Sequence, residues 1–108
     1  MRGSKTGRPI MVALDLLGRR TALRLLWELR EGPLTFRALQ EACDTNARLL
    51  NTRLAEFRAS GLIEHDVGGY RLSREGLRLL EGLRPLSEWA QRWAKSDPRA
   101  LDATRRDG

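Results

Sequence analysis

The side chains best suited to chemistry in this sequence are gathered in one polar segment, Asn46–Ser60. Spaced at helical intervals along one side of that segment are Arg48, Asn51 and Thr52, with Arg53 next to them. A guanidinium can form two parallel hydrogen bonds with guanine, and a primary amide can do the same with adenine. The opposite side carries Leu50, Leu54 and Phe57, which have the spacing of a helix face packed on a core. The segment is therefore predicted to be a helix that presents base-reading side chains to double-stranded DNA.

Other polar residues near this segment are suited to the DNA backbone. Thr35 stands where the preceding helix should begin, and a helix N-terminus offers a hydroxyl and free N–H groups to a phosphate. Asn46 stands at the equivalent place before the base-reading helix, and capping that helix is a strong competing role for its amide. The hairpin that follows adds an arginine. The complete set of expected DNA-binding residues is Thr35, Asn46, Arg48, Asn51, Thr52, Arg53 and Arg71.

The overall charge also favours a polyanion as partner. Lys and Arg number 20 against 14 for Asp and Glu, which gives a net charge of +6. All the cationic residues other than Lys5 and Lys95 are arginine, which is better suited than lysine to bidentate bonding with phosphate and guanine. Nucleic acid is the usual partner of such a domain. The alternative is an arginine-rich composition with an ordinary solvated surface. For His65, exposure to solvent and contact with DNA are equally compatible with the sequence.

The sequence offers little support for an enzyme. It has one cysteine, Cys43, and one histidine, His65, which excludes a disulfide framework, a multi-cysteine zinc site and a His-pair metal site. No Ser/His/Asp set, acid pair or Gly-rich phosphate loop has a meaningful spacing, and no cofactor motif is present. Cys43 is either a small buried apolar residue or a redox sensor. We therefore predict a protein that is not an enzyme and that needs no cofactor or metal.

The length of 108 residues fits one domain. No apolar run approaches the ~18 residues of a membrane span, and no signal-peptide pattern follows the basic start. We therefore expect a cytoplasmic protein without a membrane partner.

Glycine and proline divide the chain into short elements. The expected helices are Pro9–Leu17, about Arg20–Arg30, a helix capped by Thr35 that runs to Cys43, Asn46–Ser60, and a last helix opened by Ser73 that runs to about Lys95. The expected strands are Leu62–His65 and Tyr70–Leu72, joined by a turn at Asp66–Gly69. In the second helix Leu23, Leu26 and Trp27 are expected to form the apolar face. Pro85 is expected to bend the last helix or to start a new segment.

This order, α-α-α-α-β-β-α, predicts a mostly α fold with a small β-hairpin, namely a winged helix-turn-helix with flanking dimerisation helices. We expect a flexible basic arm at residues 1–8, the domain at residues 9–95, and a flexible tail at residues 96–108. The terminal helices are surplus to a winged helix, and their tryptophans are too apolar to leave in water. They either close over the domain's own core or meet a second copy of the chain. The expected dimer interface consists of Met11, Leu14, Leu83, Leu86, Trp89 and Trp93.

Several short motifs resemble those of HxlR-type winged helix-turn-helix transcriptional regulators, which share their DNA-binding half with MarR- and ArsR-like proteins. The motifs are Ala13-Leu14-Asp15-Leu16-Leu17-Gly18, Phe36-Arg37-Ala38-Leu39, Leu49-Leu50-x-x-Arg53-Leu54-x-x-Phe57-x-x-Ser60-Gly61-Leu62-Ile63, Tyr70-Arg71-Leu72-Ser73-x-x-Gly76 and Leu86-x-x-Trp89. Their order and spacing cover about residues 8–95. The resemblance implies a dimeric DNA-binding regulator in which the helix at Asn46–Ser60 enters the major groove, the hairpin is the wing, and the terminal helices form the dimer.

The chain departs from this family pattern in three places. Arg8 stands where members commonly have a cysteine, so sensing through that cysteine does not carry over. Arg19-Arg20-Thr21 replaces the usual Gly-Lys-Trp, and the wing is several residues shorter than usual.

Taken together, these observations predict a homodimeric regulator, most simply a repressor, that reads a near-palindromic operator with its recognition helices about one DNA turn apart. A winged helix used for protein interaction or assembly, without specific DNA binding, is the alternative. No effector is indicated.

Overall fold

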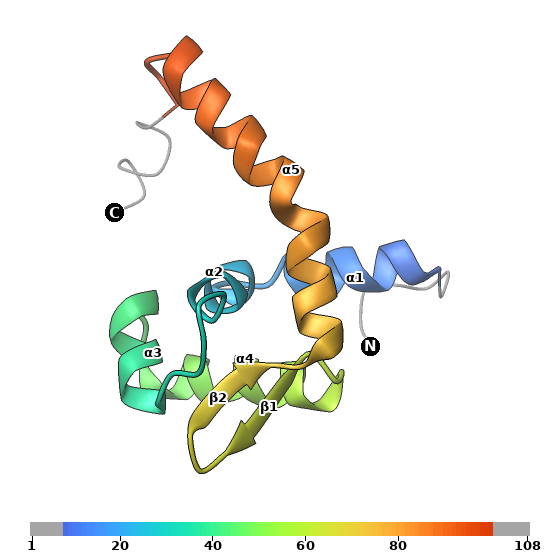
Figure 1. The fold of residues 1–108 in the computed structure, drawn as a ribbon, viewed down its shortest axis with the longest axis vertical. Coiled ribbons are helices and arrows are strands. Elements are labelled where there is room, and N and C mark those ends of the chain that lie inside the picture. Colours follow the sequence, from blue (N-terminus) through green and yellow to red (C-terminus); the bar gives the residue numbers. More distant parts are fainter. Residues whose placement is uncertain (1–7, 101–108) are drawn as a thin grey trace.

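The computed structural model of this chain describes residues 8–100, and the expected basic arm and tail lie outside this range except for Arg8 and residues 96–100. The elements are α1 (Pro9–Leu17), α2 (Ala22–Glu28), α3 (Phe36–Cys43), α4 (Ala47–Ala59), β1 (Ile63–Asp66), β2 (Gly69–Leu72) and α5 (Arg74–Ser96). Figure 1 shows α2, α3, α4 and the hairpin gathered in one body, from which α1 extends to one side and α5 extends upward. The order and the winged helix-turn-helix architecture agree with the prediction.

Three helices begin at capping side chains that the sequence had marked. The side-chain oxygen of Thr35 accepts a hydrogen bond from Ala38 N at 3.1 Å, and that of Asn46 accepts one from Leu49 N at 2.7 Å. Ser73 accepts from the backbone N–H three residues later at 3.1 Å. Each cap satisfies a donor that the first turn of a helix leaves unpaired. The starts of α3, α4 and α5 are therefore fixed by local chemistry.

The second helix differs from the expectation in both length and orientation. It covers Ala22–Glu28 instead of about Arg20–Arg30. It starts after Thr21 because the backbone of that residue is left-handed (φ 71°), outside the α-helical region. Its buried face consists of Ala22, Leu25, Leu26 and Leu29. Leu23 and Trp27, which we expected to face the core, are 38% and 41% exposed. The helix is therefore rotated away from the predicted face.

The hydrophobic core lies between α2, α3 and α4, and the hairpin closes it. Leu39 of α3 and Leu50, Leu54 and Phe57 of α4 are at most 2% exposed, as the periodicity of α4 predicted. Further members of the core are Leu16, Ala22, Leu25, Leu26, Leu29, Cys43, Ile63 and Leu72. Packing on this core holds α4 by one face only, so its other face is open.

The wing is a two-stranded antiparallel hairpin in which Glu64 pairs with Arg71 and His65 pairs with Tyr70. Its turn is shorter than the expected Asp66–Gly69, because Asp66 and Gly69 already belong to the strands. Leu34, just before α3, exchanges both backbone hydrogen bonds with Tyr70, at 2.9 and 2.8 Å. The wing is therefore attached directly to the start of the helix-turn-helix.

Glycine is required where the wing meets this link. Gly69 has φ 114°, and a Cβ there would lie 2.6 Å from the carbonyl oxygen of Leu34. A side chain at this position would force the wing away from α3. The left-handed Gly61 (φ 81°), which ends α4, was expected from the sequence.

The last helix continues through Pro85 as one element, and its upper half leans away from the lower half in Figure 1. Gly76 at its base is buried, and a Cβ there would collide with the carbonyl oxygen of Leu62. Beyond the helix, Arg99 bonds the carboxylate of Asp97 in a turn that ends at Ala100. None of the helices within residues 8–100 is long and apolar enough to cross a membrane.

Candidate nucleic-acid interface

The open face of α4 carries the polar side chains that the sequence singled out. Arg48, Asn51, Thr52 and Ala55 are all exposed on the side opposite the core residues. Within residues 8–100 neither the guanidinium of Arg48 nor the amide of Asn51 has a hydrogen-bond or ion-pair partner. Thr52 donates its hydroxyl hydrogen to the carbonyl of Arg48 at 3.1 Å. The face therefore presents a charged donor and an amide that are available to a ligand.

Thr35 and Asn46 flank this face as caps. Their side-chain oxygens are occupied by the backbone bonds described above. What remains is the hydroxyl hydrogen of Thr35 and the amide N–H₂ of Asn46, which can still donate. The capping role that competed for Asn46 in the sequence is confirmed. These two residues can therefore still donate hydrogen bonds to a partner, which suits a phosphate.

Arg53 is turned toward the protein. Its Nε donates to the carbonyl of Arg20 at 2.7 Å, and its Nη1 lies 3.1 Å from Glu56 Oε1. The side chain is only 14% exposed. Arg19 completes the group, because its Nη1 lies 2.8 Å from Glu56 Oε2. The sequence suggested Glu56 as a partner of Arg58 and not of Arg53 or Arg19. The i+3 spacing from Arg53 was visible, but the contact with Arg19 joins elements far apart in the chain.

The wing carries its own counter-charges. Arg71 is paired with Glu64 at 3.2 Å and also with Asp66, and its side chain is 42% exposed. Two carboxylates against one guanidinium leave this part of the hairpin with an excess of negative charge. A phosphate contact by Arg71 therefore has to compete with two ion pairs that are already formed.

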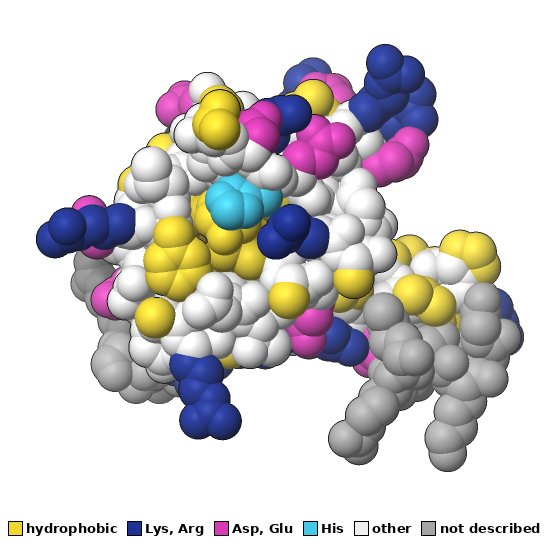
Figure 2. Space-filling view, turned by 90° about the horizontal axis from the view of Figure 1, so that it is seen from below, with side chains coloured by type: hydrophobic (Ala, Val, Ile, Leu, Met, Phe, Trp, Pro, Cys, Tyr) yellow, Lys and Arg dark blue, Asp and Glu magenta, His cyan; other side chains and the backbone are white. Residues whose placement is uncertain are grey.

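The only histidine lies on the same hairpin. The imidazole of His65 stacks on the ring of Tyr70, with centroids 3.9 Å apart and planes 5° apart. Figure 2, which views the molecule from the hairpin end, shows this imidazole (cyan) near the middle of the face, beside hydrophobic side chains and with Lys and Arg side chains spread around it. The residue is exposed, so both solvent and DNA contact remain compatible with its position.

The residues expected at a dimer interface are exposed in the single chain, apart from Leu83. Met11 and Leu14 on α1 are 40% and 56% exposed, and Leu86, Trp89 and Trp93 on α5 are 51%, 47% and 38% exposed. The two indoles stack on each other with centroids 5.0 Å apart. Leu83 is half-buried against the body. The tryptophans therefore do not close over the chain's own core.

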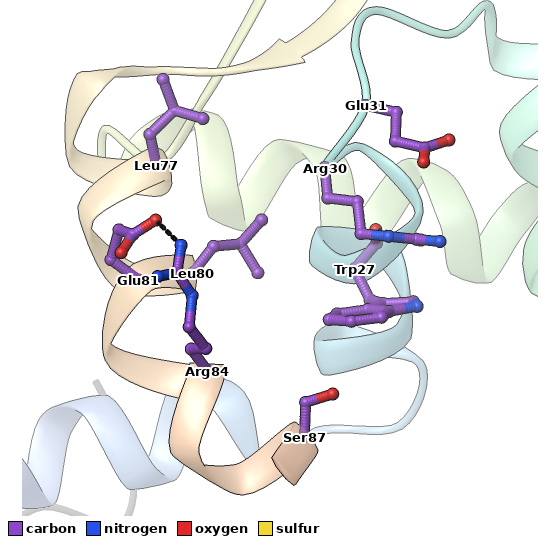
Figure 3. Close-up of a pocket in the computed structure, with 8 residues that line it drawn as sticks. All are labelled: Trp27, Arg30, Glu31, Leu77, Leu80, Glu81, Arg84 and Ser87. Atoms are coloured by element: carbon purple, nitrogen blue, oxygen red, sulfur yellow. Dashed lines mark hydrogen bonds and ion pairs between the residues drawn. The ribbon is translucent and has the colours of Figure 1, made fainter.

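A cleft of about 430 Å³ separates α2 from α5 (Figure 3). Its walls carry Trp27 on one side and Leu77 and Leu80 on the other. The rim holds two arginines and two glutamates, of which Arg84 and Glu81 form an ion pair at 2.5 Å. The formal charges of these four rim side chains therefore cancel.

The remaining candidate chemistry is a single thiol. Cys43 is 7% exposed at the end of α3. Burial raises the pKa of this thiol, the charge of Glu28 raises it further, and Arg24 partly opposes the effect. A raised pKa disfavours the reactive thiolate, which supports the packing role over the sensing role. Across residues 8–100, no three His, Cys, Asp or Glu side chains are grouped in a way that could hold a metal ion.

Comparison with known proteins gives a consistent result. The sequence profile described as HxlR-like helix-turn-helix matches residues 16–98. The uncharacterized HTH-type transcriptional regulator MJ0925 of Methanocaldococcus jannaschii is 27% identical over 86 residues, which cover 75% of this chain and 81% of that protein. The uncharacterized HTH-type transcriptional regulator YvaP of Bacillus subtilis is 30% identical over 98 residues, which cover 83% of this chain and 89% of that protein. The solved structure of quinone-bound YodB from Bacillus subtilis aligns with a TM-score of 0.72 and 26% identity, and covers 77% of this chain and 96% of that chain.

Proposed function

Because this chain belongs to the HxlR-like helix-turn-helix family of transcriptional regulators, we propose that it binds double-stranded DNA in a sequence-specific way as a homodimer. The observation that carries the proposal is the open face of α4, where Arg48 and Asn51 are exposed and unpartnered within the described residues. Unpaired polar groups on an exposed helix of this kind are suited to base edges in the major groove.

The spacing on α4 matches the spacing of base pairs. From Arg48 to Ala55 the helix rises about 10 Å at ~1.5 Å per residue. This length corresponds to roughly three base pairs at ~3.4 Å each. Arg48 suits a guanine, Asn51 suits an adenine, and Thr52 suits either base or the methyl group of thymine. Each recognition helix would therefore read one short half-site.

The backbone contacts that we propose follow from the donors that the caps leave free. Thr35 and Asn46 donate to phosphates that flank the half-site, which fixes the register of α4 on the DNA. Arg71 adds a weaker phosphate contact in this proposal, because Glu64 and Asp66 already pair with it. Arg53 does not read a base in this proposal, since its guanidinium is engaged inside the protein.

The dimer that we propose uses the apolar side chains that α1 and α5 expose. Large apolar residues grouped on a protruding helix mark an interaction surface. A two-fold axis through this surface buries the same residues of both copies. Two recognition helices related by that axis read a near-palindrome with half-sites about 34–36 Å apart. We also propose that the protein works in the cytoplasm and represses transcription, because a bound dimer is sufficient to block a promoter.

The test is selection from a pool of random duplexes with the purified protein, followed by binding titrations at ~50 and ~200 mM salt. We expect one enriched near-palindrome. The Arg48→Ala variant should lose about 1–3 kcal/mol of binding free energy and relax its preference at the matching position. Arg58→Ala is the matched control, because it removes the same charge from an exposed position near the other end of α4.

Two results would contradict the proposal. The first is weak binding without any selected sequence that disappears at the higher salt, since this is the behaviour of a generic basic surface. The second is an equal loss in the Arg48→Ala and Arg58→Ala variants, because only charge would then matter. Either result would favour the alternative of a protein-interaction module.

A further inference from the structure

One carboxylate joins the link between α1 and α2 to the recognition helix. Glu56 lies on α4, and each of its two oxygens contacts a different arginine: Oε2 contacts Arg19 at 2.8 Å, and Oε1 contacts Arg53 at 3.1 Å. Arg53 continues the connection, because its Nε bonds the carbonyl of Arg20 at 2.7 Å. We call Glu56, Arg19 and Arg53 the Glu56 clamp.

The clamp is shielded from water more than the other ion pairs on the surface. The side chains of Arg53, Arg19 and Glu56 are 14%, 28% and 28% exposed. The i,i+3 pair of Arg78 and Glu75 on α5, by comparison, is 66% and 62% exposed. Shielded charges are screened less by solvent and salt, so these contacts restrain the backbone more than an exposed pair does.

The link itself is held in a single unusual conformation. Thr21 is a β-branched residue with φ 71°, a backbone region that such residues rarely enter. Strain of this kind persists only where the surroundings impose it. The bond from Arg53 to the carbonyl of Arg20, next in the chain, belongs to those surroundings. The link therefore has little freedom to pivot.

We propose that the Glu56 clamp is a positioning device that sets the angle between α4 and α1, and through it the spacing between the half-sites that a dimer reads. This inference rests on the proposed function. The helix α1 carries Met11 and Leu14 of the proposed interface, and α4 carries the base-reading face. In a two-fold dimer a change of the angle between α1 and α4 occurs in both copies. It therefore alters the distance between the two copies of α4.

Loss of the clamp would loosen α4 without detaching it. Leu50, Leu54 and Phe57 anchor the helix in the core whether or not Glu56 is present. Each α4 can therefore still recognise its own half-site. What changes is the precision with which two half-sites are matched, since one base pair of extra spacing moves a half-site by ~3.4 Å and turns it by about 35°.

The experiment measures affinity for a series of duplexes that carry the selected half-sites at the native spacing and at spacings shorter or longer by single base pairs, together with a duplex that has one half-site. The wild type is compared with Glu56→Ala and with Arg19→Ala, which removes the ion pair between Glu56 and the α1–α2 segment but keeps the pair between Glu56 and Arg53 within α4. Glu81→Ala is the matched control, because it breaks an exposed i,i+3 Arg–Glu pair on α5 that lies beside the C-terminal end of α2 and not beside the segment that carries Arg19.

We expect both clamp variants to lose roughly tenfold in affinity for the duplex with the native spacing. This loss lies within the range of interaction energies between residues of one hydrogen-bond or ion-pair network. Their affinity for a single half-site and their salt dependence should match the wild type, so the spacing profile becomes flat. A direct phosphate contact by Arg53 predicts a different pattern, in which Arg53→Ala weakens all duplexes equally and lowers the salt slope by about 1.

The results that overturn the inference are distinct from those that overturn the proposed function. A clamp variant that keeps the wild-type spacing profile refutes the inference. An equal loss of affinity for every duplex, the single half-site included, also refutes it, because a general defect such as poor folding then accounts for the loss. If Glu56→Ala folds poorly, the Arg19→Ala variant tests the inference instead, because it changes no residue of α4. A wild-type protein that selects no half-site refutes the proposed function, and this inference with it.

Discussion

Replacement of Trp89 by Asp tests whether the exposed face of α5 is the dimer interface. The side chain is 47% exposed in the single chain. An indole buries about 150–250 Å², so roughly 100 Å² remains for a partner to cover. At ~25 cal/mol per Å² this area corresponds to about 2.5 kcal/mol for each copy, or about 5 kcal/mol for the symmetric pair. The carboxylate adds the cost of a charge that has no partner in the interface.

This loss would raise the dimer dissociation constant by roughly three to four orders of magnitude, because every ~1.4 kcal/mol is a factor of ten. Sedimentation velocity over a wide range of protein concentration measures the change directly. The Val67→Asp variant is the control: Val67 at the wing tip is fully exposed and lies outside the proposed interface. An unchanged dimer in the Trp89→Asp variant, or equal dissociation of both variants, would refute the reasoning.

Three further predictions concern the folded chain. Asn46→Ala should cost about 1 kcal/mol of unfolding free energy by removing the cap of α4, whereas Asn51→Ala on the open face should change it by less than ~0.5 kcal/mol in urea titrations. Gly76→Ala should destabilise by about 1–3 kcal/mol because its Cβ meets a backbone carbonyl, while Gly82→Ala, which meets nothing within 4 Å, should stabilise the same helix. The Cys43 thiol should resist an aromatic disulfide reagent in the native protein and react in urea. Because folding raises the pKa of this thiol, its contribution to stability is fully present below the ordinary thiol pKa and is lost as the pH rises from there through the raised pKa of the folded protein. A fast reaction of the Cys43 thiol in the native protein would contradict the reasoning that burial protects it.

The elements and the family could be predicted from the sequence because their signals are local. Thr35 and Asn46 cap their helices through bonds that reach only three residues along the chain. The spacing of Leu50, Leu54 and Phe57 is a property of one helix, and it is enough to orient α4. The resemblance to HxlR-type regulators, carried by the order of such motifs, is confirmed by the family match over residues 16–98.

The face of α2 shows where local signals end. Leu23 and Trp27 share a helical stripe with Leu26, and the sequence alone favours that stripe as the buried one. In the structure the left-handed Thr21 changes the point at which the helix begins, and Leu25 and Leu29 are buried in place of the expected pair. The choice between two neighbouring apolar stripes depends on where the link from α1 enters, which no pattern within α2 records.

The helices, the hairpin, the open side of α4 and the apolar side of α5 could therefore be read from the sequence. Periodicity, caps and turn residues act over a few positions, so they can be read along the chain. Which arginines are available to a partner, by contrast, depends on how the elements pack together. Arg48 stays open, Arg53 is bound to the link before α2, and Arg71 is held by two carboxylates of the wing. A guanidinium can reach acceptors in any element that folding brings near it, and composition cannot show which of them it meets.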